Sequence, residues 1–475
     1  MSDALKKSFT TLRQLHKEFI YKGYTIEKTA DHYHVEYDFE ISDLSEFKAK
    51  WDFPLAPVGI RPAGCDPAKD LTTDPIFNRL VFNLGMVECI SYYKITCPER
   101  FRVKCGLLTD EQLKWWRKLM YNGLGEFMYR NGIDVSEEDL VNITCNDCDE
   151  KKGATESVAR FLHDERSYDG YLTPVGGGKD SVVSLELLKD KDIITYTVNG
   201  NDTTRAVIDV CDHKSADYTA SRKLDKRMLD LNAKGYLNGH TPFSAIVAFS
   251  SVIAAYILGR KYITLSNESS ANESTVRDSF VNHQYSKSYE FECDFGRYLS
   301  EITDSDIHYF SMLRPLTELQ IAALFATFKD YHKVFRSCNA GSKQGIWCCN
   351  CPKCLFVYII LSPFLSEEAL GDIFGEKLLD KESLDKDFRE LTGIDENKPF
   401  ECVGTRSEVT AAVKYYRKNG GRSLLTDRYS DHIDRVTVED IRELLMQWCE
   451  EHNVPEELSD IVRNAMENVN DGIRR

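Results

Sequence analysis

The sequence predicts an α/β protein that is built on a doubly wound parallel sheet, with an N-terminal α+β region and a mostly helical C-terminal part. Between about residues 165 and 366, short apolar runs alternate with longer segments of helical spacing, which is typical of parallel strands connected by helices. Beyond residue 367 the chain is acidic and its pattern is helical. We therefore expect three regions, residues 1–150, 151–366 and 367–475.

The N-terminal region is expected to contain both strands and helices. Polar and apolar residues alternate over residues 24–42, which predicts a β-hairpin with "TADH" (29–32) as its turn. Residues 111–132 have helical spacing, and Asn131-Gly132 provides a C-cap. The elements expected further along the chain are strands at 170–175, 192–200 and 261–267, helices at 181–190, 244–259, 316–328 and 354–365, and a loop at 396–405.

The composition excludes several classes of protein. The net charge is -16 and the pI is about 5.3, so the chain lacks the basic excess of a non-specific nucleic-acid binder, and we expect no nucleic-acid partner. The longest apolar run, residues 245–259, is too short to span a bilayer, so we expect no membrane partner. There is no apolar leader, and the fifteen cysteines are an odd number, so we expect a cytoplasmic protein without a disulfide framework.

The stretch "YLTPVGGGKDSVVSLELL" (171–188) is the clearest functional signal in the sequence. It predicts a buried strand, a turn made by Gly176–Gly178, and a helix that Ser181 opens. In an open parallel sheet, ligands bind at the carboxyl ends of the strands. The bare backbone N–H groups, the positive end of the helix and the Lys179 ammonium are together suited to hold phosphate oxygens. A glycine-rich turn without a ligand is the alternative.

Two familiar phosphate motifs do not fit this loop. A Walker A loop would need glycine at Thr173 and serine or threonine at Asp180, and a dinucleotide fingerprint would need glycine at Ser181. The core "GGKDS" (177–181) resembles instead the pyrophosphate loop of the ATP pyrophosphatases (adenine nucleotide α-hydrolase-like fold), which cleave ATP between its α and β phosphates. This resemblance implies that Asp180 acts near the phosphates through Mg²⁺, since two like charges need a cation between them.

A group of closely spaced cysteines predicts a metal site. The expected ligands are Cys338, Cys348, Cys351 and Cys354. Four thiolates in so short a loop predict a closed, tetrahedral structural Zn²⁺ site that holds the loop in place. Cys349 interrupts the C-x₂-C-x₂-C spacing and is left out. Unligated thiols and an iron–sulfur cluster are the alternatives, and the isolated pair Cys145 and Cys148 is not expected to bind metal.

Other polar stretches contribute candidate site residues. "SNESSANEST" (266–275) follows a predicted strand, so it should lie at the sheet edge that carries the glycine loop. Its candidate ligands of Mg²⁺ or of substrate are Asn267, Glu268 and Glu273. "VNHQYSKSYEFE" (281–292) is a polar stretch in an aromatic frame, and its candidates are His283, Gln284, Lys287 and Glu292. Histidine and lysine exchange protons near neutral pH when a site perturbs them. For both stretches, a solvent-exposed loop is the alternative.

Two single residues complete the candidates. His240 stands just before a predicted helix, where it either transfers protons or serves as a structural or capping histidine. Arg314 follows the strand-like "IHYFSML", and a guanidinium there suits a phosphate or a carboxylate; a surface ion pair is the alternative.

The chain as a whole resembles the pyrophosphate-loop UDP-N-acetyl-α-D-muramoyl-L-alanyl-L-glutamate epimerases of bacterial peptidoglycan precursor synthesis. The glycine loop identifies only the superfamily, whereas "VNHQYSKS" and the N-terminal stretches narrow the resemblance to this family. The stretches that carry it, spread from about residue 85 to 405, are "GMVECISYYK", "NGLGEF", "GGGKDS", "NGHTPFSAI", "SNESSANE", "VNHQYSKSYEFE", "RPLTELQIA", "WCCNCPKC" and "PFECVGT".

The resemblance implies an ATP-dependent epimerase that converts the terminal L-Glu of UDP-MurNAc-L-Ala-L-Glu to D-Glu and releases AMP and pyrophosphate. It implies ATP and Mg²⁺, with the UDP-sugar dipeptide as the small-molecule partner, in addition to the structural Zn²⁺ that the cysteine spacing predicts. The oligomeric state stays open. The implied ATP-binding residues are Gly176, Gly177, Gly178, Lys179, Asp180 and Ser181. The implied catalytic residues are Lys179, Asp180 and Ser181 together with the proton-transfer candidates His240, Glu268, His283 and Lys287. Cys402 is a rival, since thiols serve in some cofactor-free racemases, and a small buried apolar residue is its alternative.

Two other functions stay open at this point. An RNA- or nucleobase-modifying enzyme of the same superfamily, such as a tRNA thiolase or a deazapurine nitrile synthase, would also adenylate its substrate. The nitrile synthases share the four-cysteine site, although the acidic charge of this chain counts against tRNA binding. A non-catalytic regulator that binds ATP or AMP as a signal is the other alternative.

Overall fold

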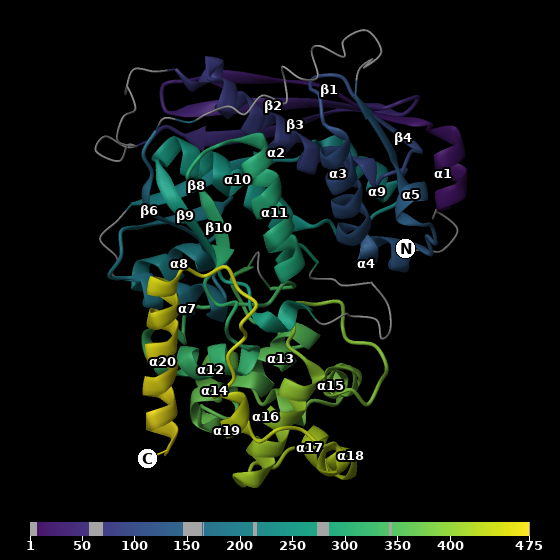
Figure 1. Cartoon of the computed structure of the whole chain (residues 1–475). Coiled ribbons are helices and arrows are strands. Elements are labelled where there is room, and N and C mark those ends of the chain that lie inside the picture. The colour runs from purple at the N-terminus through teal and green to yellow at the C-terminus, as the bar shows by residue number, and fades with distance from the viewer. Residues whose placement is uncertain are drawn as a thin grey trace. The chain divides into compact units, whose positions relative to one another are not determined.

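The structure is a computed structural model, and it describes residues 7–56, 70–145, 164, 166–211, 216–272, 285–341 and 344–474. The chain divides into two compact units (Figure 1). The first unit comprises Met1–Leu172, Tyr218–Ile263 and Glu290–Tyr309, and the second unit comprises Thr173–Asp217, Thr264–Tyr289 and Phe310–Arg475. His283, Glu273, Gln284 and Cys148 lie outside the described residues.

The described residues form one mixed β-sheet. Its strands are β1 Glu18–Lys28, β2 His32–Ile41, β3 Ser45–Pro54, β4 Arg100–Val103, β5 Asn142–Cys145, β6 Asp169–Pro174, β7 Ile193–Val198, β8 Asp217–Lys223, β9 Arg260–Leu265 and β10 His308–Ser311. They are hydrogen-bonded in the order β10-β9-β6-β7-β8-β3-β2-β1-β4-β5. The pairs β6–β9, β1–β4 and β4–β5 are parallel, whereas β1–β2, β2–β3 and β3–β8 are antiparallel. The predicted α/β class is confirmed, and the antiparallel strands enlarge the sheet beyond what was predicted.

Helices connect these strands and form most of the C-terminal part. The longer helices are α2 Pro75–Tyr93, α3 Asp110–Gly123, α4 Gly125–Asn131, α7 Lys179–Leu188, α8 Asp202–Val210, α9 Lys226–Ala233, α10 Phe243–Leu258, α11 Tyr289–Ile302, α12 Glu318–Thr327, α13 Pro352–Leu361, α14 Glu367–Phe374, α15 Asp385–Thr392, α16 Arg406–Lys418 and α20 Glu456–Arg474. The helical C-terminal part is drawn in light green to yellow in Figure 1. The strands and helices predicted between residues 170 and 365 are confirmed, with bounds shifted by a few residues.

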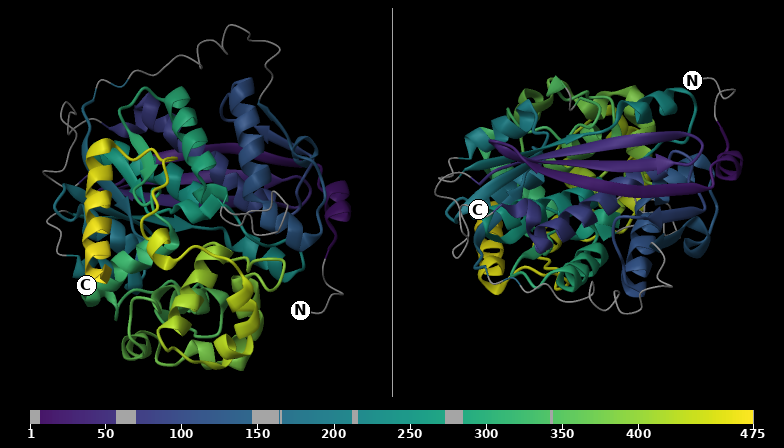
Figure 2. Two further views of the ribbon diagram at one scale, coloured as in Figure 1. Left: turned by 60° about the horizontal axis from the view of Figure 1, so that its bottom comes forward. Right: turned by 90° about the horizontal axis from the view of Figure 1, so that it is seen from above.

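The predicted hairpin is confirmed in the first unit. Strands β1 and β2 pair from Phe19 opposite Ile41 to Lys28 opposite Tyr33, and the Thr29 N–H donates to the His32 carbonyl over 2.9 Å across the turn. Every second residue of β2 is buried, as expected for a sheet with one covered face. Figure 2 (right) shows β1, β2 and β3 in purple as three long strands side by side.

The face of this hairpin is covered by α2, which is buried along nearly its whole length. Gly85 lets the helix approach the sheet, because a Cβ at this position would lie 2.0 Å from the Tyr21 Oη. One turn along, the buried Glu88 carboxylate accepts hydrogen bonds from Trp51 Nε1 over 2.7 Å and from Arg222 Nη2 over 2.8 Å. Polar contacts therefore join α2 to β3 and β8 inside the core.

The helix predicted over residues 111–132 is two helices in the structure. Helix α3 ends at Gly123 and α4 begins at Gly125, with Leu124 between them at φ -98° and ψ 7°. A Cβ on Gly123 would lie 2.8 Å from Pro242 Cγ, so the break coincides with a close tertiary contact that helical spacing does not encode. The predicted C-cap is confirmed, since Gly132 ends α4 in the left-handed region at φ 63°.

Among the residues that the structure describes, no helix combines the length and the apolar character that a bilayer span requires. The cysteines in this part of the chain form no disulfide bond.

Candidate active site

The predicted glycine loop connects β6 to α7 in the second unit. Val175 N–H donates to the Tyr196 carbonyl over 2.8 Å, which continues the pairing with β7 past the end of β6. Gly177 has φ 83°, and a Cβ there would lie 3.0 Å from Thr203 Cγ2. A side chain at this position would be both strained and crowded. The close turn thus depends on this glycine.

The loop leaves the start of α7 open to an anion. Gly178 is the N-cap residue, and no side chain caps the helix, so the first backbone N–H groups remain available to a ligand. Two hydrogen bonds fix the loop behind them. Gly176 N–H donates to Ser181 Oγ over 2.9 Å, and Arg336 N–H donates to the Gly177 carbonyl over 2.9 Å.

Three carboxylates gather beside this loop. Asp180, Glu268 and Glu318 each offer an oxygen within 4.8 Å of the others. They follow the strands β6, β9 and β10, which are neighbours in the sheet, so the carboxyl ends of three adjacent strands deliver the three side chains. Glu268 and Glu318 are buried, and Asp180 is half-buried. Converging carboxylate oxygens are the ligands that Mg²⁺ prefers, so these residues fit the expected metal ion.

Lys179 lies among these carboxylates. Its ammonium contacts Asp180 Oδ1 and Glu318 Oε2, and its side chain is 1% exposed. Burial works against the charged form, but the two carboxylates outweigh it and raise the pKa of Lys179 above its ordinary value. The lysine is therefore a fixed cation at the opening of α7.

The carboxylates differ in their pKa values. Burial raises the pKa of Glu318, Lys179 lowers it in part, and Asp180 and Glu268 raise it again, so the net pKa stays above the ordinary value. Burial also acts to raise the pKa of Asp180, but Lys179 and Lys353 outweigh this and hold it below the ordinary value. Burial and the neighbouring carboxylates thus disfavour the charged form of Glu318, and a divalent cation bound there would favour it.

Arg314 does not form the surface ion pair that was the alternative to a phosphate or carboxylate contact. It is 0% exposed. Its Nη1 donates to the Glu268 carbonyl and its Nη2 donates to the Lys287 carbonyl, each over 2.6 Å. The guanidinium therefore joins the two segments that carry Glu268 and Lys287.

The loop around Cys402 contacts the same carboxylate group. Lys353 Nζ donates to the Cys402 carbonyl. Burial works against the charged form of Lys287, but Cys402, Glu268 and Asp180 outweigh it and raise the pKa of Lys287 above its ordinary value. Gly404 lies against Glu318, since a Cβ on Gly404 would be 3.1 Å from Glu318 Cβ. Sequence analysis named Lys287 and Cys402 but missed Glu318 and Lys353.

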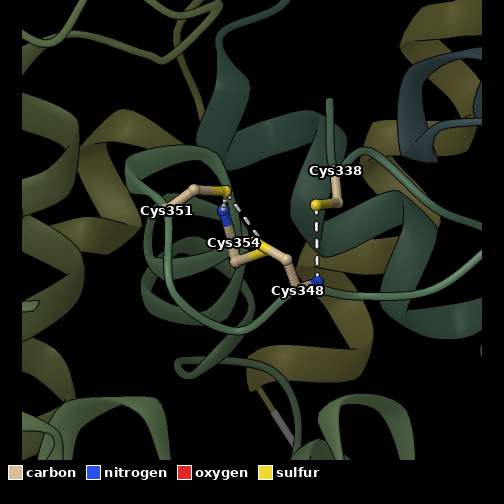
Figure 3. A group of neighbouring side chains, drawn as sticks. All are labelled: Cys338, Cys348, Cys351 and Cys354. Carbon is tan, nitrogen blue, oxygen red and sulfur yellow. Dashed lines mark hydrogen bonds between the residues drawn. The ribbon is translucent and has the colours of Figure 1, made fainter. Parts of the chain in front are cut away.

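The four predicted zinc ligands converge (Figure 3). The sulfur atoms of Cys338, Cys348, Cys351 and Cys354 lie within 4.8 Å of one another. The Cys354 sulfur is 3.7 Å from that of Cys348 and 3.5 Å from that of Cys351. These separations are close to the distance of about 3.8 Å between the sulfur ligands of a tetrahedral zinc ion with zinc–sulfur bonds of about 2.3 Å. The donor set therefore fits zinc.

Backbone groups around the cysteines suit thiolate ligands. Gly341 N–H donates to Cys338 Sγ over 3.1 Å, and Cys354 N–H donates to Cys351 Sγ over 3.5 Å. Contacts with Cys354 hold the pKa of Cys351 below its ordinary value. Cys349 is directed elsewhere, because its thiol donates to the Phe374 carbonyl over 3.2 Å.

The cysteine cluster also supports the glycine loop. Arg336, whose N–H binds the Gly177 carbonyl, and Ser337, whose Oγ lies 2.7 Å from the Cβ position of Gly178, directly precede Cys338. Lys353 lies between Cys351 and Cys354 in the first turn of α13. A metal in the cluster would thus fix both the backbone behind the loop and a lysine beside the carboxylates.

The other predicted site residues have different surroundings. Asn267 donates to Ser311 Oγ over 3.0 Å. His240 belongs to the first unit, where its Nδ1 lies 3.6 Å from Glu126 Oε2. Glu292 is buried in α11, also in the first unit.

Family models cover most of the chain. The MurL N-terminal domain matches residues 10–312, and the MurL C-terminal domain matches residues 334–431. No solved structure matches the chain.

Three curated relatives carry the name UDP-N-acetyl-alpha-D-muramoyl-L-alanyl-L-glutamate epimerase. The relative from Micromonospora sp. is 35% identical over 392 residues, which are 78% of this chain and 84% of the relative. The relatives from Salinispora tropica and Xanthomonas oryzae pv. oryzae are 34% and 31% identical, each over 80% of this chain and 84% of the relative.

Proposed function

The chain belongs to the MurL family, and from this membership we propose that it is an ATP-dependent epimerase of peptidoglycan precursor synthesis. Its substrate is UDP-MurNAc-L-Ala-L-Glu, whose terminal L-Glu it converts to D-Glu. The curated relatives are named for an epimerase of this glycopeptide, and the chain spans 84% of the length of each. ATP is cleaved to AMP and pyrophosphate in the process.

One structural observation supports the proposed dependence on ATP. An uncapped helix start, a buried lysine and three converging carboxylates meet around the loop of residues 176–181. The backbone N–H groups and Lys179 suit the phosphates, and Asp180, Glu268 and Glu318 would hold Mg²⁺. The ion would supply positive charge against the phosphate oxygens when bound.

The chemistry explains why an epimerase needs a nucleotide. An α-proton beside a free carboxylate is a very weak acid, because its removal adds a second negative charge to an anion. Attack of a carboxylate oxygen on the α-phosphorus of ATP forms an acyl adenylate and removes the carboxylate charge. The α-proton can then be taken from one face and returned to the other, after which hydrolysis of the acyl adenylate releases the product and AMP. Positive groups around the phosphates stabilise the departing pyrophosphate.

The assay that tests this function uses purified protein, ATP, Mg²⁺ and UDP-MurNAc-L-Ala-L-Glu. AMP and pyrophosphate are expected in equal amounts, together with a glycopeptide whose acid hydrolysate contains D-Glu. Formation of ADP and orthophosphate, or of D-Glu without ATP, would overturn the proposal.

A pair of variants tests whether ATP is cleaved at the glycine loop. Asp180→Asn should abolish pyrophosphate release, because it removes one of the three anionic ligands. Asp190→Asn is the matched control, since Asp190 is exposed just beyond α7 and should keep the wild-type rate. Equal rates for both variants would locate the ATP site elsewhere.

A further inference from the structure

A further group of possible metal ligands lies in the first unit. His32 and His34 stand two residues apart on β2, and Asp52 lies on the neighbouring strand β3. Side chains two residues apart point to the same face of a strand, and the register places His34 directly opposite Asp52. One ligand atom of each residue lies within 4.8 Å of the others. The pairing of β2 with β3 therefore gathers two imidazoles and a carboxylate on one face of the sheet.

Both imidazoles approach the same carboxylate oxygen. His34 Nδ1 lies 2.5 Å from Asp52 Oδ1, and His32 Nε2 lies 3.4 Å from the same atom. Zinc bonds of about 2.1 Å to nitrogen and oxygen place tetrahedral ligands about 3.4 Å apart. The contact of His32 already has this length, and the contact of His34 would lengthen by about 1 Å around an ion. Small side-chain movements are therefore enough to admit a metal.

A second carboxylate orients one of the imidazoles. His32 Nδ1 lies 2.7 Å from Asp31 Oδ1, and this oxygen also accepts a hydrogen bond from Thr29 Oγ1 over 3.0 Å. Histidines that bind metals commonly donate the N–H of the other ring nitrogen to a carboxylate, which fixes the tautomer and the direction of the ring. A proton on Nδ1 leaves the lone pair of His32 on Nε2, the nitrogen that faces Asp52.

Other carboxylates on this face of the sheet are paired differently. Glu36 pairs with Lys50 over 2.7 Å, and Asp38 pairs with Lys48 over 3.0 Å. A protonated lysine has no lone pair and cannot bind a metal ion. At Asp52, two imidazoles take the place of the lysine, and neutral imidazole is the commonest metal ligand of proteins. The ligand chemistry is therefore specific to this end of the hairpin.

We propose that His32, His34 and Asp52 form a binding site for a transition-metal ion of the Zn²⁺ class, distinct from the cysteine site. Imidazole ligands favour Zn²⁺, Ni²⁺ or Cu²⁺ over Mg²⁺. Three protein ligands leave a coordination position to water, and the three side chains are 23% to 28% exposed, so the ion exchanges with solvent. The bound ion joins β2 to β3 and stabilises the hairpin. This site does not depend on the proposed function.

Isothermal titration calorimetry with Zn²⁺ tests the site on the full chain without a histidine tag, after the cysteine site has been loaded with zinc. Millimolar Mg²⁺ in the buffer occupies sites made of oxygen ligands alone. The wild-type protein should bind one further Zn²⁺ per chain. His34→Ala and Asp52→Asn should each weaken this binding by about 100-fold or more, because each removes a ligand. Asp31→Asn should weaken it by about 10-fold, because it removes only the partner that orients His32.

Matched variants separate this site from other zinc binding. His308→Ala should leave the affinity unchanged, because His308 belongs to another histidine–aspartate pair of the first unit, with Asp306 at 2.8 Å. Cys351→Ser should also keep this ion, since the cysteine site lies elsewhere in the sequence. In a parallel thermal melt, Zn²⁺ should raise the melting temperature of the wild-type protein by more than that of His34→Ala.

Two results would overturn the assignment. One is a zinc-loaded wild-type protein that binds no further Zn²⁺. The other is binding with wild-type affinity in both His34→Ala and Asp52→Asn, which would place the additional ion at other ligands.

Discussion

At the scale of single residues, the site contains a carboxylate, that of Glu318, which no motif in the sequence predicts. Glu318 is the first residue of α12, where it follows the N-cap Thr317, and acidic residues are common at this position for reasons of helix stability alone. Glu318 differs from an ordinary acidic residue at a helix start, because it is only 1% exposed and contacts Lys179. The usable signal was its place after β10, at the same sheet edge as Asp180 and Glu268.

Replacing this carboxylate tests its place in the site. Glu318→Gln removes the charge that Lys179 and the expected metal ion share, so we expect pyrophosphate release to fall by about 100-fold or more. Glu368→Gln, on the exposed side of α14, is the control and should keep the wild-type rate. The fall in pyrophosphate release is measured by steady-state kinetics at varied Mg²⁺ concentration. An unchanged rate in Glu318→Gln would show that this residue does not belong to the site.

Other site residues show what a sequence can and cannot predict. Glu268 was predicted to lie near the glycine loop because loops after neighbouring parallel strands share one edge, and the structure brings it within 4.8 Å of Asp180. The two partners of Arg314, the backbone carbonyls of Glu268 and Lys287, were not predicted. Backbone acceptors have no sequence pattern, so this role could be found only from the fold.

At the scale of elements, the loop between β6 and α7 is held by several specific contacts. Its conformation was predictable, since three glycines between a strand and a helix have few other uses. The hydrogen bond from Arg336 to Gly177 was not, because Arg336 belongs to the segment before Cys338. In the first unit, the edges of β3 and β8 were likewise not expected to join, since pairing partners far apart in sequence have no local signal.

Gly177 gives a prediction about this loop. Gly177→Ala places a Cβ at φ 83° and 3.0 Å from Thr203 Cγ2, so we expect a loss of about 1–2 kcal/mol in the free energy of unfolding and a higher KM for ATP. Gly371→Ala is the matched control, because a Cβ there meets nothing within 4 Å inside α14. It should leave the KM for ATP unchanged and slightly stabilise the helix. Equal KM values for the two variants would contradict the expected role of the loop.

The cysteine loop gives a second prediction at this scale. Cys351→Ser should remove the bound zinc measured by atomic absorption and lower the melting temperature, since three ligands hold the ion less well than four. Cys349→Ser should retain about one zinc per chain, because the Cys349 thiol faces the Phe374 carbonyl. Retention of zinc in Cys351→Ser, or its absence from the wild-type protein, would contradict the assignment.

At the scale of the whole molecule, the chain folds into two compact units. The core of the first unit contains a charged group, because Glu88 is 0% exposed and bound by Arg222 and Trp51. Sequence patterning predicts apolar cores well, but it cannot show that the one acidic residue of the mostly apolar α2 is turned inward. A buried ion pair tolerates the loss of one partner poorly.

This pair gives the prediction for stability. Glu88→Gln leaves the Arg222 charge uncompensated inside the core, so the free energy of unfolding in urea should fall by about 3–5 kcal/mol. Glu36→Gln is the control, because Glu36 pairs with Lys50 over 2.7 Å on the exposed face of the hairpin, and such pairs contribute about 1 kcal/mol or less. A small change in Glu88→Gln would show that the arginine finds another acceptor.

The contact of Lys179 with Asp180 and Glu318 means that the carboxylate group already has a tethered counterion. A metal ion that arrives alone must compete with this ammonium for the same oxygens, and the displaced ammonium then has no acceptor. A metal ion that arrives on a polyphosphate provides one, because the ammonium can turn to the phosphate. Nucleotide and metal are thereby favoured as a joint ligand, and occupation of the centre by metal alone is disfavoured.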